Sequence, residues 1–201
     1  MARLALNKSS LSEQGKRLRI YERHLPSLDL KRRQLIAERS KARKELRKTR
    51  GRIEALGASI ARDLPMLSTD AVDPSRLVDI GHVSIGQENI VGVSLPRFHE
   101  VEIVRHAISL LIQPAWLDVL IDRLASMLEL RVLGEVQSER LERLEAAVQT
   151  ITQRVNLFEK VLIPRTREHI RRIRIHLSDA ERAAVVAGKI AKRKRADGEA
   201  P

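Results

Sequence analysis

The chain has 201 residues, of which 32% are charged and only four are aromatic: Tyr21, Phe98, Trp116 and Phe158. Compact cores of this length usually rely on more aromatic side chains, so the composition favours helices that bury one narrow stripe. Cysteine is absent, which excludes a disulfide framework, a thiolate nucleophile and a cysteine-ligated zinc site. The N-terminus lacks the apolar core of a signal peptide and no apolar run approaches about 20 residues, so we expect a cytoplasmic protein without a membrane span.

The basic charge is concentrated towards the two ends of the chain. The formal net charge is +12; residues 1–66 contribute +11 and residues 165–201 contribute +6. The two segments between them are weakly acidic, with −3 for residues 67–113 and −2 for residues 114–164. A basic protein of this kind raises nucleic acid as one possible partner.

The first predicted element is a helix over residues 1–66. Its apolar residues recur at spacings of three, four and seven, which is typical of the a and d positions of a coiled coil. Pro26 interrupts this pattern, but the stripe continues on both sides, so we expect a kink rather than two separate helices. Pro65 marks the expected end of the helix. The stripe consists of Leu4, Leu11, Leu18, Leu25, Leu28, Leu35, Ala42, Leu46, Thr49, Ile53, Leu56 and Ile60.

The middle segment, residues 67–113, has a different character. His82–Ile85 and Asn89–Leu95 are predicted as two short strands, with a turn at Gly86–Glu88 between them. A lone two-stranded hairpin is marginally stable in water, so it must pack on the helices or on a partner.

A second long helix is predicted over residues 114–190, with Pro114 in its first turn. Pro164 should kink this helix, and the basic and polar tail, residues 191–201, is expected to be disordered. The apolar stripe of this helix consists of Leu117, Leu120, Leu124, Leu128, Leu141, Leu144, Val148, Ile151, Val155, Phe158, Leu162, Ile170, Ile173, Leu177, Ala180 and Ala184.

Neither helix can bury its stripe alone, and the connection between them is long enough for the second helix to fold back. The predicted fold is therefore all-α: one long antiparallel two-helix coiled coil with the small β-hairpin-containing segment at one end. If the chain folds back near residue 90, Leu18 lies near Leu162 and Leu56 near Leu124. The C-terminal helix would then extend beyond Met1.

The sequence contains no phosphate-binding loop, dinucleotide fingerprint or nucleophile elbow. His169 and His176 are seven residues apart on a helix, too far for joint ligation of a metal. We therefore predict no catalytic, cofactor-binding or metal-binding residues. The basic run Lys192–Arg195 could bind nucleic acid or an acidic surface, but no aromatic residues interleave with it to support base stacking.

Two parts of the sequence resemble one family. The segments Leu6–Leu11 and Leu28–Leu35 look like the N-terminal helix of the D subunit of V-type and archaeal-type rotary ATPases. The segment Arg154–Pro164 is similar to that family's RVN-x-x-E-x-x-x-IP run, and the helix that follows also resembles the family through Leu177–Arg182. The chain departs from the family pattern at Glu22–Pro26, where relatives have a smoother helix.

This resemblance implies a non-catalytic central rotor shaft that transmits torque between ATP chemistry and proton or sodium transport. The implied partners are the catalytic and non-catalytic ring subunits (A and B), a small central-stalk subunit (F) and a funnel-shaped subunit (C or d) on the membrane ring. The chain would be peripheral to the membrane. Candidate partner-binding residues are Arg154, Asn156, Glu159, Lys189, Lys192 and Arg193.

Two other classes of protein remain as alternatives. The high pI alone is compatible with a basic coiled-coil protein that binds nucleic acid or the ribosome, and the helices are compatible with an adaptor. Strongly salt-dependent RNA binding would favour the first alternative, whereas stable capture of a nucleotide-binding ring would favour the rotor shaft.

Overall fold

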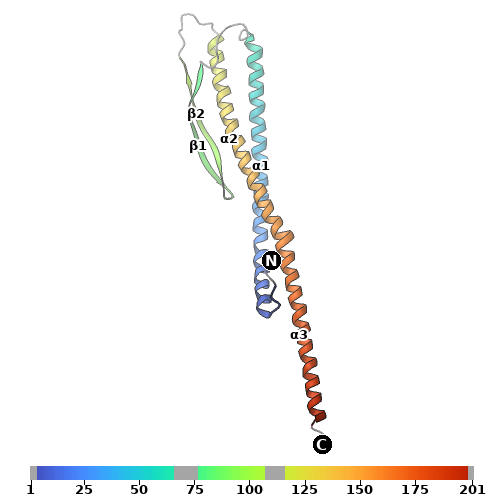
Figure 1. Ribbon diagram of the computed structural model, residues 1–201. Coiled ribbons are helices and arrows are strands. Elements are labelled where there is room, and N and C mark those ends of the chain that lie inside the picture. The colour runs from blue at the N-terminus through green and yellow to red at the C-terminus, as the bar shows by residue number, and fades with distance from the viewer. Residues whose placement is uncertain (1–3, 66–76, 107–115, 199–201) are drawn as a thin grey trace. The chain divides into compact units, whose positions relative to one another are not determined.

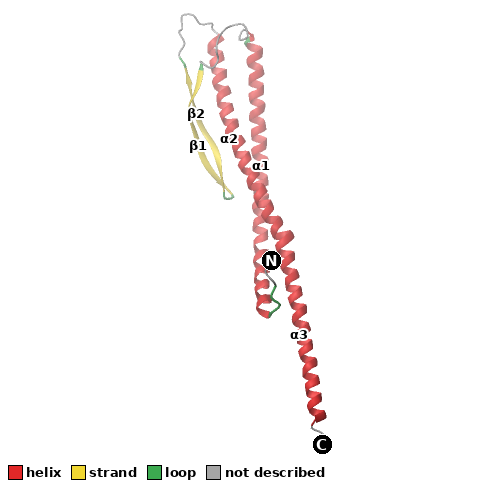
Figure 2. Ribbon diagram, in the orientation of Figure 1, coloured by secondary structure: helices red, strands yellow, loops and turns green. Residues whose placement is uncertain are grey.

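The computed structural model describes residues 4–65, 77–106 and 116–198. The elements follow in the order α1 (Lys8–Asp63), β1 (Val78–Ile90), β2 (Val93–Arg105), α2 (Trp116–Asn156), η3 (Leu157–Leu162) and α3 (Ile163–Gly198) (Figures 1 and 2). Two long helical segments with a two-stranded hairpin between them confirm the predicted fold class. The predicted turns at residues 67–76 and the helix start at Pro114 lie outside the described residues.

The chain divides into two compact units. The terminal unit comprises Met1–Leu30 and Ile151–Pro201, and the central unit comprises Lys31–Thr150. The four segments predicted from the sequence follow secondary structure and do not coincide with these units. The terminal unit carries 19 of the Lys and Arg residues and 9 of the Asp and Glu residues, a net charge of +10, which leaves +2 for the central unit.

In the terminal unit, the first part of α1 runs antiparallel to α3. Arg167 pairs with Glu22 at 2.7 Å, and Lys8, nearer the start of α1, pairs with Glu181, farther along α3, at 3.9 Å. The start of α1 is fixed by Asn7, whose side-chain oxygen accepts a hydrogen bond from the backbone N–H of Ser10 at 2.7 Å, as an N-cap residue does. The buried apolar residues of this unit include Ile151, Val155, Ile163, Ile170 and Ile173.

In the central unit, the second part of α1 packs antiparallel to α2. Arg43 pairs with Glu145 at 2.6 Å, and Asp63, at the end of α1, pairs with Arg123, near the start of α2, at 2.7 Å. The predicted stripe residues lie between the two helices, which confirms the a and d assignment here. The buried ones include Leu35, Ala42, Leu46, Thr49, Leu144 and Val148.

The cross-helix contacts fit the predicted register at one point and are displaced from it by several residues at others. Tyr21 contacts Phe158, as the predicted register requires. Leu18 borders a surface groove with Arg167 and Ile170, farther along α3 than the predicted partner Leu162. The prediction assumed a symmetric fold-back near residue 90, whereas the observed pairs are set by packing of the side chains.

The hairpin is longer than predicted and turns at a different place. β1 and β2 have 13 residues each and pair in antiparallel register, so that Ile90 lies opposite Val93. Val91 and Gly92 form the turn with φ of 55° and 83°, and the side-chain oxygen of Asn89 accepts the N–H of Gly92 at 2.9 Å. Two consecutive residues with positive φ are typical of the tight turns that match strand twist. The predicted turn at Gly86–Glu88 is therefore wrong, and these residues belong to β1.

An apolar cluster joins the base of the hairpin to both helices. The sequence requires this contact because an isolated hairpin cannot bury enough apolar surface. From this base, at the end of the helix pair where α1 finishes and α2 starts, the hairpin extends along α2 (Figures 1 and 2). The buried members of the cluster are Leu64, Leu77, Val78, Leu117, Leu120 and Ala125.

The last part of α3 is more regular than predicted. The helix continues through Gly198, so residues 191–198 are helical and the prediction of disorder is corrected for them. Alanine, lysine and arginine dominate this stretch, and all three are good helix formers. Residues 181–195 are all exposed, so no residue of this helix end is buried against the rest of the terminal unit.

Candidate partner-binding surfaces

A π-helix occupies the segment that carries the family-like run. η3 spans Leu157–Leu162, and the backbone N–H of Ile163 donates to the carbonyl of Phe158, five residues earlier. Pro164 explains its position. In a continuous α-helix the ring of Pro164 would press on the carbonyl of Lys160 and leave it without a donor. The π-helix changes the backbone spacing at that carbonyl, and π-helices of this kind are frequent at functional sites.

Side-chain contacts hold the π-helix against the rest of the terminal unit. The rings of Tyr21 and Phe158 meet edge to face, with centroids 5.5 Å apart and planes at 83°. Such aromatic pairs contribute more to folding stability than burial of their apolar area alone would give. On the following turn, the hydroxyl of Thr166 donates to the carbonyl of Leu162 at 2.6 Å, and Thr166 is 6% exposed.

Three of the predicted partner-binding residues lie at this junction. Arg154 and Glu159 are exposed, and Asn156 is half-buried. The exposed surface beside them is apolar, because Leu157 and Val161 keep 46% and 47% of their surface in solvent. An apolar pair flanked by charged residues is a surface that a partner protein could cover.

The other three predicted residues lie far along α3. Lys189, Lys192 and Arg193 are exposed, about 45 Å from Glu159 at the rise of an α-helix. The helix there is amphipathic: Val186 and Ile190, one turn apart, are 55% and 53% exposed. The structure thus divides the six predicted residues into two surfaces, the π-helix junction and the basic end of α3.

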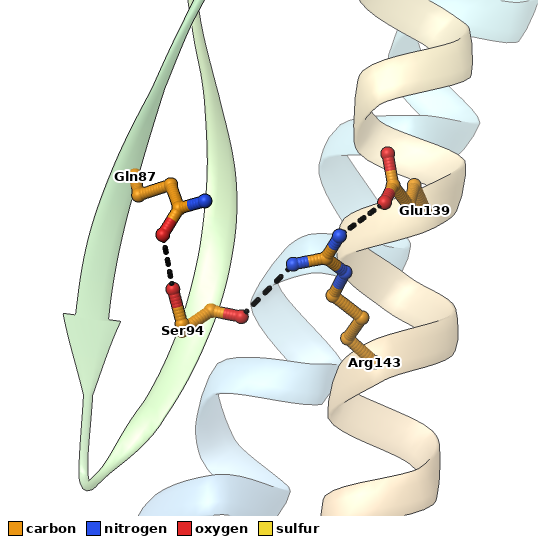
Figure 3. Close-up of polar contacts among 4 residues, drawn as sticks. All are labelled: Gln87, Ser94, Glu139 and Arg143. Carbon is orange, nitrogen blue, oxygen red and sulfur yellow. Dashed lines mark hydrogen bonds and ion pairs between the residues drawn. The ribbon is translucent and has the colours of Figure 1, made fainter.

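Sequence reasoning missed a third polar contact, between the hairpin and α2. Arg140 donates to a carboxylate oxygen of Glu88 at 3.0 Å and to the carbonyl of Pro96 at 3.4 Å. Arg143 donates to the carbonyl of Ser94 at 3.3 Å and also pairs with Glu139 (Figure 3). A signal was present in the sequence, since these two arginines stand one turn apart in a stretch of α2 that is otherwise rich in glutamate.

Among residues 4–65, 77–106 and 116–198, no group of three or more His, Asp or Glu side chains is placed to hold a metal ion. Two of the hollows are open surface grooves, one of about 600 Å³ between the start of α1 and the start of α3 and one of about 430 Å³ beside β2. The surfaces suit protein partners rather than the enclosed binding of a small molecule.

Comparison with known proteins identifies the family. The family model for the D subunit of ATP synthases matches residues 10–193. The chain belongs to the ATP synthase D-subunit family. The V-type ATP synthase D subunit of Borreliella burgdorferi is 33% identical over 194 residues, which covers 96% of this chain and 95% of the relative. The D subunits of the V-type ATP synthases of Chlamydia pneumoniae and Chlamydia muridarum are each 34% identical, over 94% and 96% of this chain and 91% and 96% of their own length.

Membership of the D-subunit family confirms the resemblance read from the RVN-like run and the N-terminal helix. It makes the chain a non-catalytic stalk subunit of a V-type ATP synthase. Within the part of the chain that the structure describes, no helix combines the length and apolar character that a membrane crossing requires.

Proposed function

We propose that the chain is the central rotor shaft of a V-type or archaeal-type rotary ATPase. It transmits torque between ATP hydrolysis or synthesis in the catalytic ring and proton or sodium transport through the membrane ring. The observation that carries this proposal is the family match over residues 10–193, which includes the paired helices of both units. A helix pair with a continuous apolar stripe resists twisting and bending better than a single helix, which suits a torque-bearing element.

The surfaces described above support an assignment of partners. The basic end of α3, with Lys189, Lys192 and Arg193, enters the ring of catalytic and non-catalytic subunits (A and B). Its charge and exposed apolar residues suit a partner surface with acidic groups around an apolar patch. Arg154, Asn156 and Glu159 contact a partner at the π-helix junction. The small subunit (F) and the funnel-shaped subunit (C or d) bind elsewhere on the chain. As part of this complex, the chain lies in the cytoplasm, peripheral to the membrane.

Reconstitution tests this proposal. The full-length chain is tagged and co-expressed with the two ring subunits and the small subunit of the same organism. We expect the tagged chain to purify with a nucleotide-binding hexamer, and ATP-driven ion transport by the membrane complex to require the chain. The isolated chain should not bind ATP at micromolar concentrations in calorimetry. Co-purification with RNA or ribosomes in place of the ring subunits would favour the nucleic-acid alternative.

A further inference from the structure

The hairpin is attached firmly at its base. Leu77 and Val78 are 2% and 6% exposed within the apolar cluster that includes residues of both helices. Arg105 pairs with Asp122 of α2 at 2.9 Å. At the same level the backbone N–H of His106 donates to the carbonyl of Leu77 at 3.1 Å. Apolar burial on several sides, together with polar contacts, fixes this half of the hairpin.

The other half, which we call the tip (residues 84–100), is attached to α2 around the buried Leu95 and by a few hydrogen bonds. Leu95 is fully buried; in a two-stranded sheet, a side chain can be covered completely only if another element packs over it. On either side of Leu95, the carbonyls of Ser94 and Pro96 accept hydrogen bonds from Arg143 and Arg140. The tip therefore meets α2 along a narrow line around Leu95.

Open grooves flank this line on both sides. One, of about 430 Å³, lies between the β2 side of the tip and the two helices, where Phe98 and Lys41 are among its lining residues. The other, of about 420 Å³, lies between β1 and α2, where Ile85 and Val132 are among its lining residues. Because side chains do not fill these grooves, the tip lacks the close packing on either side that would hold it in place.

One polar atom beneath the tip opposes the docked position. The side-chain oxygen of Gln137 is buried in the first groove and has no hydrogen-bond partner among the described residues. A buried acceptor without a donor costs free energy. This cost disappears when the acceptor is exposed and can form a hydrogen bond with water. Arg143 also keeps Glu139 as a partner when the tip leaves, so its loss of the Ser94 carbonyl is partly compensated.

We propose that Arg140 and Arg143 form a latch that holds the tip of the hairpin against α2, and that the tip opens about its fixed base. Arg140 is the stronger half of the latch, because its side chain is 17% exposed and its pair with Glu88 is shielded from solvent. Opening exposes Leu95 and Val136, which are buried in the docked state. This inference concerns the chain alone and does not depend on the proposed function.

Thiol labelling of single-cysteine variants tests the latch, because the natural chain has no cysteine. Leu95→Cys reports opening of the tip, and Leu120→Cys, 1% exposed in the base cluster, reports opening of the base or of the whole central unit. In the full-length chain we expect Leu95→Cys to react at least about tenfold faster than Leu120→Cys, since local opening is cheaper than global unfolding.

Substitution of the two latch arginines should change the rate of thiol labelling at Leu95→Cys only. Adding Arg140→Ala and Arg143→Ala should accelerate labelling at Leu95→Cys by about tenfold or more and leave Leu120→Cys unchanged. Gln137→Leu should slow labelling at Leu95→Cys, because it removes the unpaired acceptor. The matched control is Arg131→Ala, an exposed arginine of the same helix with no partner among the described residues.

A distance measurement distinguishes opening from general loosening. Spin labels at Arg97→Cys on the tip and Glu142→Cys on α2, both exposed, should give a short and a long population, and the long one should grow when the latch arginines are replaced. Equal labelling rates at Leu95→Cys and Leu120→Cys would overturn the proposal. So would equal acceleration of both, or a single unchanged distance in the latch variant.

Discussion

Gly86 lies in the middle of β1, directly beneath the ring of His99 on the neighbouring strand. A Cβ atom built on Gly86 would stand 2.2 Å from Nε2 and 2.8 Å from Cδ2 of His99. Gly86 pairs with Arg97 in the strand register, so its role is to let another side chain approach the backbone closely. The residue that the sequence suggested as a turn therefore serves the packing of one strand against the other.

Gly86→Ala should weaken the hairpin by about 1–3 kcal/mol, the usual cost of forcing an extra methyl group into a packed site. Hydrogen exchange of the amides that join β1 to β2 measures this loss. Adding His99→Ala should restore most of the protection, because the colliding ring is then absent. Gly15→Ala serves as the control, since a Cβ there meets nothing within 4 Å. Unchanged exchange in Gly86→Ala would show that His99 moves away freely.

At the scale of one element, α1 tolerates several residues that disfavour helices, among them Pro26 and Gly51. Pro26 lies inside the helix, and α1 nevertheless continues through it from Lys8 to Asp63, which confirms that the proline does not divide it into two helices. The hydroxyl of Ser27 donates to the carbonyl of His24 at 2.8 Å, whereas the carbonyl that Pro26 deprives of its helical donor is that of Glu22. Gly51, by contrast, is exposed and a Cβ there would contact nothing within 4 Å.

Gly51→Ala should stabilise the chain by about 0.5–1 kcal/mol, because alanine loses less backbone entropy in a helix and here meets no obstacle. Thermal unfolding followed by circular dichroism measures the gain. Gly92→Ala is the opposite control: its φ of +83° is strained for any side chain, so it should destabilise the hairpin. Lower stability of Gly51→Ala would contradict the placement of Gly51 on an open face of α1.

At the scale of the whole molecule, charge and burial are distributed unequally. The terminal unit carries a net charge of +10, and residues 181–195 of α3 are all exposed. The last residues of α3 that are buried are Ile170 and Ile173. Truncation of the chain after Leu177 therefore keeps the buried contacts of this unit and removes its exposed basic helix end, together with the surface ion pair of Glu181 with Lys8.

Under the proposed function, truncation after Leu177 should leave helicity and binding of the small subunit unchanged. Association with the catalytic ring should be slower and less salt-dependent, because charge steers encounter more than it sets final affinity. Stopped-flow mixing with the ring at several salt concentrations measures both. A full-length variant with Lys189, Lys192 and Lys194 changed to glutamine separates charge from length. If truncation alters neither association nor coupled ion transport, the basic end of α3 does not enter the ring.

The two long helices and their antiparallel pairing could be predicted from the sequence. Apolar residues at spacings of three and four are a local property, and Leu35, Ala42, Leu144 and Val148 are buried as that spacing requires. The stripe indicates which face of each helix is buried, but not which residue lies opposite which, so the predicted pairing of Leu18 was displaced. Of the candidate surfaces, the sequence indicated the RVN-like run and the basic end of α3 through residue types and order.

The length of the hairpin strands, the approach of His99 to Gly86 and the contacts of Arg140 and Arg143 were decided only by the tertiary structure. Gly86 is a strand residue because His99, on the other strand, packs over it. Arg140 meets Glu88 across 52 residues of sequence, and no local pattern can specify such a pair. Spacing along the chain determines which residues share a face of one element, whereas these features depend on which face of another element comes within contact distance.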